Sequence, residues 1–220
     1  MRVVIAGGHG QIALELERLL SARGDSPVGL VRNPAYADDL AAAGAEAVVC
    51  DLESATADEL AGYLKNVDAV VFSAGAGPNS GTNRKDSVDR AAAVLLADAA
   101  ALAGIRRYLL VSSMGVGRPL AAGSDESWAA YMVAKTAAED AVRGYDLDWT
   151  VLRPGGLTND APTSRVRLET PSTMRGTVTR ADVAAVLLAL LDAPATAGLT
   201  LELIAGDTPI TDAVAATSRP

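Results

Sequence analysis

Residues 2–13 read Arg2-Val3-Val4-Ile5-Ala6-Gly7-Gly8-His9-Gly10-Gln11-Ile12-Ala13. The apolar run 2–6 is typical of a buried strand, and the leucines after the glycines fall at helical spacing. Glycines between a strand and a helix let backbone N–H groups approach a pyrophosphate, and the helix N-terminus favours its negative charge. The stretch therefore predicts a dinucleotide-phosphate site at the first turn of the chain. Its candidate binding residues are Gly7, Gly8, His9, Gly10, Gln11 and Ile12.

Strand-like and helix-like segments alternate along the rest of the chain. Short runs rich in Val, Ile and Leu predict strands at 2–6, 27–32, 46–50, 67–72, 107–112, 148–153 and 199–204. Helical patterns fall between them at about 11–23, 35–43, 56–65, 83–104, 127–144 and 180–192. Runs such as 69–72 are apolar throughout, which indicates burial on both faces, as in a parallel sheet. The order predicts an α/β fold with a doubly wound, mostly parallel sheet in a single domain, residues 1–220.

The segment 155–179 breaks this alternation. It is rich in Gly, Pro, Thr and Ser, and 165–168 is its one candidate strand. Long irregular segments inside compact domains are often lids or binding loops, although a passive surface connection fits the composition equally well. We expect this segment to form a loop or lid on the substrate side, as part of a small C-terminal lobe.

Composition narrows the classes of function. Half of the 220 residues are hydrophobic, which is enough for a full core. The net charge of −8, from 19 basic and 27 acidic side chains without a basic patch, disfavours nucleic acid and anionic membranes as partners. His9 is the one histidine and Cys50 the one cysteine, so an internal disulfide is excluded and a metal site is improbable. We interpret Cys50 as a buried residue at a strand end.

No apolar run reaches the length of a transmembrane helix, and the first run is too short for a signal peptide. We therefore expect a cytoplasmic protein that acts on a small molecule. Whether it is a monomer or a homodimer stays open, because helices in this fold can be buried by the sheet or by a partner.

The later strand ends add candidate cofactor contacts. Arg32 ends the second strand, where an acidic residue would bind the ribose 2′-hydroxyl of NAD and an arginine accommodates the 2′-phosphate of NADP. The nearest carboxylates, Asp38 and Asp39, fall in the next predicted helix, so the pattern favours NADP. Asp51 and Leu52 follow the third strand, where Asp51 is placed either to bind the adenine amino group or to cap the next helix. Small residues after the fourth strand would let the backbone approach the dinucleotide: Ser73, Ala74 and Gly75.

Tyr131 and Lys135 are the strongest catalytic candidates. Their spacing of four residues puts the phenol and the ammonium on one helix face, in the helix after the fifth strand. A neighbouring cation favours the phenolate, so this tyrosine can give or take a proton while hydride moves to or from a carbonyl carbon. Ser112 and Ser113 end the fifth strand; we expect Ser112 to contact the cofactor and choose Ser113 as the hydroxyl that orients a substrate carbonyl. The alternative is a serine pair that satisfies backbone groups.

These residues together resemble the short-chain dehydrogenase/reductase superfamily, and most closely its small atypical members with NAD(P)H-binding Rossmann domains. The matching segments are Gly7/Gly10/Ala13, Arg32, Asp51-Leu52, Ser73-Ala74-Gly75, Ser112-Ser113, Tyr131-x-x-x-Lys135, Arg153-Pro154-Gly155-Gly156-Leu157 and Thr179-Arg180-Ala181-Asp182-Val183-Ala184. The resemblance implies that the nicotinamide lies beside Pro154, Gly155, Gly156 and Leu157, and that Lys135 also holds its ribose. Asp89 stands where the superfamily usually has a fourth active-site residue, asparagine. It is placed to hold Lys135, or to pair with Arg90 or Arg84.

The resemblance implies an NADP(H)-dependent oxidoreductase that transfers hydride between the nicotinamide and a small carbonyl or quinone-like substrate. Tyr131 would be the general acid/base, Lys135 its electrostatic partner, Ser113 the carbonyl orienter and Asp89 a support for the lysine. Two other functions use the same cofactor site: a non-catalytic NADP(H) sensor, and an isomerase or epimerase that works by transient oxidation. The chain lacks the large C-terminal domain of the extended epimerases, which argues against a bulky nucleotide-sugar substrate.

Overall fold

The structure, a computed structural model, describes residues 1–75, 85–120, 123, 125–171 and 175–217. Its helices are α1 (Gln11–Arg23), α2 (Ala37–Ala42), α3 (Ala57–Tyr63), α5 (Ala92–Ala103), α6 (Glu126–Arg143), α7 (Arg180–Leu191) and α8 (Ile210–Thr217). Its strands are β1 (Arg2–Ala6), β2 (Ser26–Val31), β3 (Glu46–Val49), β4 (Ala69–Phe72), β5 (Arg107–Val111), β6 (Asp148–Pro154), β7 (Gly156–Thr158), β8 (Arg165–Glu169), β9 (Thr177–Thr179), β10 (Leu199–Ala205) and β11 (Thr208–Pro209). Short 3-10 turns span Pro34–Tyr36 and Pro194–Thr196, and Lys85–Ala91 is π-helical.

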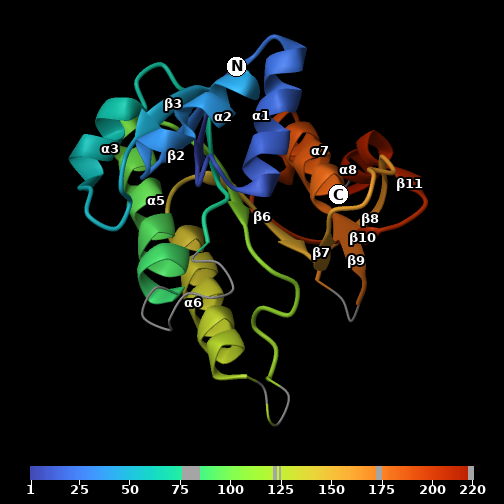
Figure 1. Ribbon diagram of the computed structural model, residues 1–220. Helices are drawn as coiled ribbons and strands as arrows, with labels where there is room; N and C mark the ends of the chain where they lie inside the picture. The colour runs from blue at the N-terminus through green and yellow to red at the C-terminus, as the bar shows by residue number, and fades with distance from the viewer. Residues whose placement is uncertain (76–84, 121–122, 124, 172–174, 218–220) are drawn as a thin grey trace.

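The central sheet has the strand order β11-β8-β10-β6-β5-β4-β1-β2-β3 (Figure 1). The strands from β3 to β10 in this order run parallel, while β8 is antiparallel to both β10 and β11. β1 lies between β2 and β4, so the chain order reverses at β1. In open sheets of this kind ligands bind beyond the carboxyl ends of the strands at such a reversal. The glycine turn after β1 therefore lies where the topology favours a ligand.

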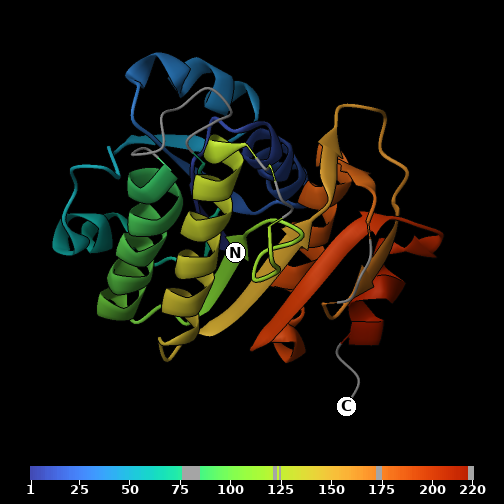
Figure 2. The same ribbon diagram turned by 90° about the horizontal axis from the view of Figure 1, so that it is seen from below.

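Helices cover both faces of this sheet. Figures 1 and 2 show α3, α5 and α6 on one face and α1, α7 and α8 on the other. The first face buries Phe72, Leu96 and Tyr108 in one apolar cluster, and the second buries a separate cluster that includes Leu16 and Leu187. Helix α5 is rich in alanine on its buried side, which lets its backbone approach the sheet closely. The doubly wound α/β fold predicted from the sequence is confirmed.

All seven predicted sheet strands are present, with ends within two residues of those expected. The prediction that 155–179 forms an irregular loop is wrong, because this segment contains β7, β8 and β9. Strand β8 alternates exposed and buried residues and packs Val166 and Leu168 into the core, while β7 and β9 pair in a small parallel sheet. The strand β11 and the helix α8, which packs against α7 and β8, were not predicted.

Two predicted helices also differ from the structure. The helix expected at 83–104 is π-helical over Lys85–Ala91 and α-helical only from Ala92, and 83 and 84 lie outside the described residues. The one expected at 35–43 is a 3-10 turn followed by α2, because the Asn33 side chain accepts a hydrogen bond from the Ala35 N–H and starts the turn early. In the described part of the chain, no helix combines the length and apolarity needed to cross a membrane.

Candidate functional site

The glycine turn packs tightly against two neighbouring strand ends. Gly7 has a φ of +82°, and a Cβ built on it would lie 2.6 Å from the Cα of Ala74, after β4. A Cβ on Gly8 would lie 2.6 Å from the Cα of Gly29, in β2. Gly10 is the N-cap of α1 and supplies no side-chain cap. The glycines thus let the turn lie between β2 and β4, and the first-turn N–H groups of α1 are left for an anionic ligand.

The predicted residues from the ends of the first four strands meet around one cavity of about 280 Å³. Its lining comprises Gly7, His9, Gly10, Leu30, Val31, Arg32, Tyr36, Cys50, Asp51, Leu52, Glu53, Ser73, Ala74, Gly75 and Val88. Its small lining residues and glycine turn fit the adenosine and phosphate half of a dinucleotide. Gln11 is exposed beside the turn, whereas Ile12 is buried and lines a second, larger cavity.

Arg32 and Asp51 lie at the rim of the smaller cavity. The Arg32 guanidinium is exposed and approaches Glu53 at 3.4 Å, so its position is free to adapt to a phosphate. Asp51 accepts a hydrogen bond from the Glu53 N–H at 3.1 Å. The alternative in which Asp51 caps the next helix is wrong, because Thr56 caps α3 through a capping box with Glu59. Cys50 is buried, as expected, and burial raises the pKa of its thiol.

The sequence did not predict the neighbours of His9. Its ring stacks on Tyr36, with centroids 3.7 Å apart, and its Nε2 lies 2.8 Å from Oδ2 of Asp39. Asp39 therefore reaches back to the glycine turn, although the sequence pattern assigned it only to the next helix. No local pattern could have shown this contact, since it joins residues 30 positions apart.

The larger cavity, of about 980 Å³, adjoins the carboxyl ends of β4, β5 and β6. It brings together the catalytic candidates Asp89, Ser113, Tyr131 and Lys135 with Ser73, Ala74, Gly75, Ser112, Pro154, Gly155, Gly156 and Leu157. Ser73, Ala74 and Gly75 also line the smaller cavity, so the two cavities share one wall. This continuity fits an extended ligand that runs from Arg32 past the glycine turn to Tyr131. Residues 76–82, which follow the segment after β4, lie outside the described residues.

Lys135 is held in place by two groups. Its side chain is 4% exposed, its Nζ donates to the Val111 carbonyl at 3.1 Å, and Oδ1 of the buried Asp89 lies 3.3 Å away. The Nζ lies 5.8 Å from the centroid of the Tyr131 ring, which is half-buried at the cavity wall. Asp89 thus lies beside Lys135. The pairing with Arg90 is wrong, because Arg90 binds Asp86, and Arg84 lies outside the described residues.

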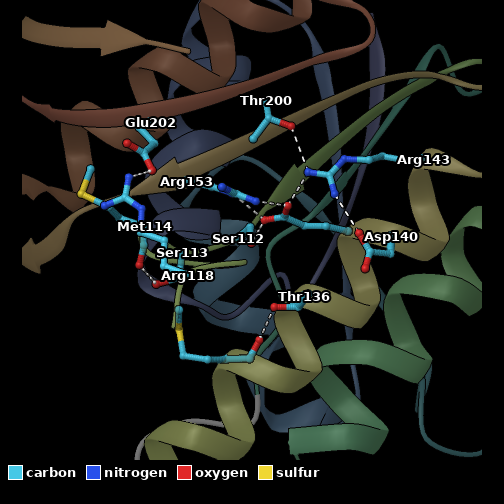
Figure 3. Close-up of polar contacts among 12 residues, drawn as sticks. Ser112, Ser113, Met114, Arg118, Thr136, Asp140, Arg143, Arg153, Thr200 and Glu202 are labelled. Carbon is cyan, nitrogen blue, oxygen red and sulfur yellow. Dashed lines mark hydrogen bonds and ion pairs between the residues drawn. The ribbon is translucent and has the colours of Figure 1, made fainter. Parts of the chain in front are cut away.

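The two serines have different surroundings (Figure 3). Ser112 is buried and donates to Oε1 of Glu139 at 2.5 Å. Ser113 is half-buried at the cavity, where its hydroxyl makes a long contact of 3.4 Å with the Met114 carbonyl. The Ser113 hydroxyl is therefore the one available to a ligand, and the Ser112 hydroxyl belongs to the wall behind it.

Glu139, which was not among the predicted site residues, organises that wall. Its carboxylate is fully buried and receives two hydrogen bonds from Arg153, at 2.8 and 2.6 Å, and one from Arg143 at 2.6 Å. Such bidentate pairing compensates the cost of burying the charges. The one available signal was spacing, since Glu139 follows Lys135 by four residues on the same helix.

The turn after β6 is held close to the second sheet. Gly156 donates from its N–H to the Gly176 carbonyl at 2.9 Å, and a Cβ on Gly155 would lie 2.3 Å from that oxygen. Met114 donates from its N–H to the Pro154 carbonyl at 2.9 Å. These contacts fix 154–157 against the end of β5, on the cavity side. No group of three or more potential metal ligands occurs among the residues that the structure describes.

Comparison with known proteins agrees with this geometry. The sequence profile of an NAD(P)H-binding family matches residues 7–194. A Bacillus subtilis protein named an uncharacterized sugar epimerase is 36% identical over 97% of this chain and 99% of its own length. The structure of a Bacillus halodurans protein described as an NAD-dependent epimerase/dehydratase has a TM-score of 0.91 and 35% identity, over 98% of this chain and 99% of that one. An anaerobillin reductase from Escherichia coli O157:H7 has a TM-score of 0.77 and 28% identity, over 94% and 98% of the two chains.

Proposed function

Because this chain belongs to the NAD(P)H-binding family, we propose that it is an NADP(H)-dependent oxidoreductase acting on a small carbonyl or quinone-like compound. The observation that carries the proposal is the position of Lys135, whose buried Nζ lies 3.3 Å from Asp89 and 5.8 Å from the centroid of the Tyr131 ring at the larger cavity. When bound, the nicotinamide supplies or accepts the hydride. The names of the relatives, which include a reductase and an epimerase/dehydratase, agree with this class of chemistry.

Each residue then has a specific task. Tyr131 gives a proton to the carbonyl oxygen during reduction and takes it back during oxidation. Lys135 lies beside the Tyr131 ring and binds the ribose hydroxyls, while Asp89 and the Val111 carbonyl hold its ammonium in position. The Ser113 hydroxyl donates to the substrate oxygen. Apolar residues, among them Met132 and Leu157, also line the cavity.

Arg32 supports the preference for NADP over NAD. Its guanidinium is exposed at the rim of the smaller cavity and contacts only one carboxylate, at 3.4 Å, in the described part of the chain. A charge-assisted contact with a phosphate is worth about 1.5–3 kcal/mol, or roughly a tenfold to hundredfold preference. We expect Arg32→Glu to lower the NADPH/NADH affinity ratio at least about tenfold. Arg165→Glu, at an exposed arginine of β8, should leave the ratio unchanged. An unaltered ratio in Arg32→Glu would show that Arg32 does not bind the 2′-phosphate.

The proton-transfer role is tested by Tyr131→Phe. NADPH oxidation is measured over a panel of aldehydes, ketones and quinones, and the best acceptor is then used for all variants. We expect turnover to fall at least ~10²-fold in Tyr131→Phe, with NADPH affinity retained. Tyr63→Phe, at an exposed tyrosine of α3, should keep full turnover. Full activity of Tyr131→Phe would refute the mechanism, and tight NADPH binding without oxidation of any acceptor would favour the sensor.

An isomerase or epimerase that oxidises its substrate transiently is the second candidate. The observation that favours it is the description of two similar proteins as epimerases, one of which matches 98% of this chain. The same residues would serve it, because Tyr131 would remove and return one proton in a single cycle. Cofactor that stays bound and is never consumed during product formation would establish this alternative over net reduction.

A further inference from the structure

The larger cavity carries an excess of positive charge, although the chain as a whole has a net charge of −8. Four basic side chains line it: Arg118, Lys135, Arg175 and Arg180. Two of these are neutralised, since Lys135 lies 3.3 Å from Asp89 and Arg118 lies 2.7 Å from the fully buried Glu202 (Figure 3). The remaining lining carboxylate is Asp125, which caps α6.

Arg175 and Arg180 are the two cations left over. Within the described ranges, no carboxylate forms an ion pair with either of them. Arg180 donates to the neutral Asn159 side chain at 2.7 Å, which steadies its guanidinium without cancelling its charge. Arg180 is also the first residue of α7, where the helix dipole adds to the positive potential. A pair of unneutralised arginines at one cavity is suited to bind a carboxylate, because the guanidinium matches its planar geometry.

An apolar wall lines the same cavity as these arginines. Eight large hydrophobic side chains are exposed in the described part of the chain, and three of them line this cavity: Leu120, Trp128 and Leu157, at 40%, 46% and 40% exposure. The Trp128 ring lies 5.4 Å from the Tyr131 ring, so the wall reaches the catalytic candidate. Apolar side chains gathered in a hollow mark a ligand surface better than isolated ones do.

The cavity also has room for a second molecule beside the cofactor. Its volume of about 980 Å³ lies at the upper end of the roughly 300–1,000 Å³ range of small-molecule sites. The nicotinamide end of a dinucleotide would fill only the part next to Tyr131 and 154–157. The rest of the cavity remains for the substrate.

We infer that the substrate is an apolar or aromatic carbonyl compound that carries a carboxylate. Its apolar body packs on Trp128, Leu120 and Leu157, and its carboxylate binds Arg175 and Arg180. This inference rests on the proposed function, because the arginines would hold the substrate with its carbonyl toward Tyr131. It narrows the substrate class from small carbonyl compounds in general to anionic ones.

The test compares two probes of nearly equal size, 2-naphthoate and the neutral 2-naphthamide. Their dissociation constants are measured by isothermal titration calorimetry on the protein saturated with NADP+. We expect 2-naphthoate to bind at least about tenfold more tightly, because its charge-assisted hydrogen bonds to arginine are stronger than those of a neutral amide. The preference should shrink at high salt. It should disappear in Arg175→Gln/Arg180→Gln and persist in the matched control Arg165→Gln.

The outcomes separate this inference from the proposed function. Three results would overturn the inference without touching NADP+ binding. They are equal affinities of the two probes, no binding of either probe, and a preference for 2-naphthoate that persists in the double variant. A loss of NADP+ affinity in Arg175→Gln/Arg180→Gln would also overturn it, because the arginines would then serve the cofactor. Failure of the wild-type protein to bind NADP(H) at all would instead refute the proposed function.

Discussion

Lys135 and Asp89 form a buried ion pair whose contribution to stability can be measured. Lys135 is 4% exposed and Asp89 is fully buried, with 3.3 Å between Nζ and Oδ1. Lys135→Met removes the cation, keeps most of the aliphatic chain and leaves the Asp89 carboxylate buried without this partner. Breaking a buried pair from one side costs about 3–5 kcal/mol, a large part of the ~5–15 kcal/mol by which domains are stable. We expect a loss of that size in the free energy of unfolding.

A double variant separates the charge effect from a packing effect. Asp89→Asn in the Lys135→Met background removes the Asp89 charge as well, so we expect most of the lost stability to return while turnover stays low. The assay is urea unfolding at neutral pH, followed by circular dichroism. The matched control is Lys65→Met, at an exposed lysine, which should change stability by less than about 0.5 kcal/mol. A loss below about 1 kcal/mol in Lys135→Met, or no recovery in the double variant, would refute the pair as a buried ionic contact.

Three further predictions concern the cofactor half of the fold. Burial raises the pKa of Glu17 from 4.5 to about 8, so the folded state favours the neutral acid. The contribution of Glu17 to the free energy of unfolding is therefore fully present below about pH 4.5 and is lost as the pH rises toward 8. Glu17→Gln should therefore flatten the pH dependence of urea unfolding between about pH 5 and 8, and an unchanged profile would refute this. Gly7→Ala should destabilise the protein by at least about 1 kcal/mol more than Gly24→Ala. Both glycines have a positive φ, but only at Gly7 would the new Cβ meet the backbone of Ala74. Equal losses of stability in thermal unfolding would contradict this close approach. The buried Cys50 should react with a thiol reagent far more slowly than a free thiol, because burial raises the pKa of its thiol. Its reaction should be slower still with NADP+ bound, because Cys50 lines the smaller cavity. Rapid labelling of Cys50 in the NADP+ complex would contradict both expectations.

Much of the fold could be predicted because its signals are local. The apolar run 2–6, the glycines after it and the leucines of α1 lie within one short stretch, and similar apolar runs precede Arg32, Asp51 and Ser73. Buried parallel strands are apolar throughout, so each one is visible by itself. The position of Tyr131 and Lys135 on one helix face follows equally from their spacing.

The rest depends on contacts between distant residues. Strand β8 pairs with β10 and β11, and its short alternating pattern was hidden among Gly, Pro, Thr and Ser. Ser112 binds Glu139, which lies 27 positions away, so no local rule could show that its hydroxyl is unavailable to a ligand. The approach of Asp39 to His9 and the pairing of Arg118 with Glu202 are likewise tertiary. The charge balance of the larger cavity could therefore be seen only in three dimensions.

The central claim is that one dinucleotide runs from Arg32 past the glycine turn to Tyr131. A crystal structure of the protein with NADP+ tests it most directly. We predict the 2′-phosphate at Arg32, the pyrophosphate at the N-terminus of α1, and the nicotinamide ring between Pro154–Leu157 and the Tyr131 hydroxyl, with its ribose at Lys135. A nicotinamide ring bound outside the larger cavity, or one that lies out of reach of Tyr131, would contradict the account.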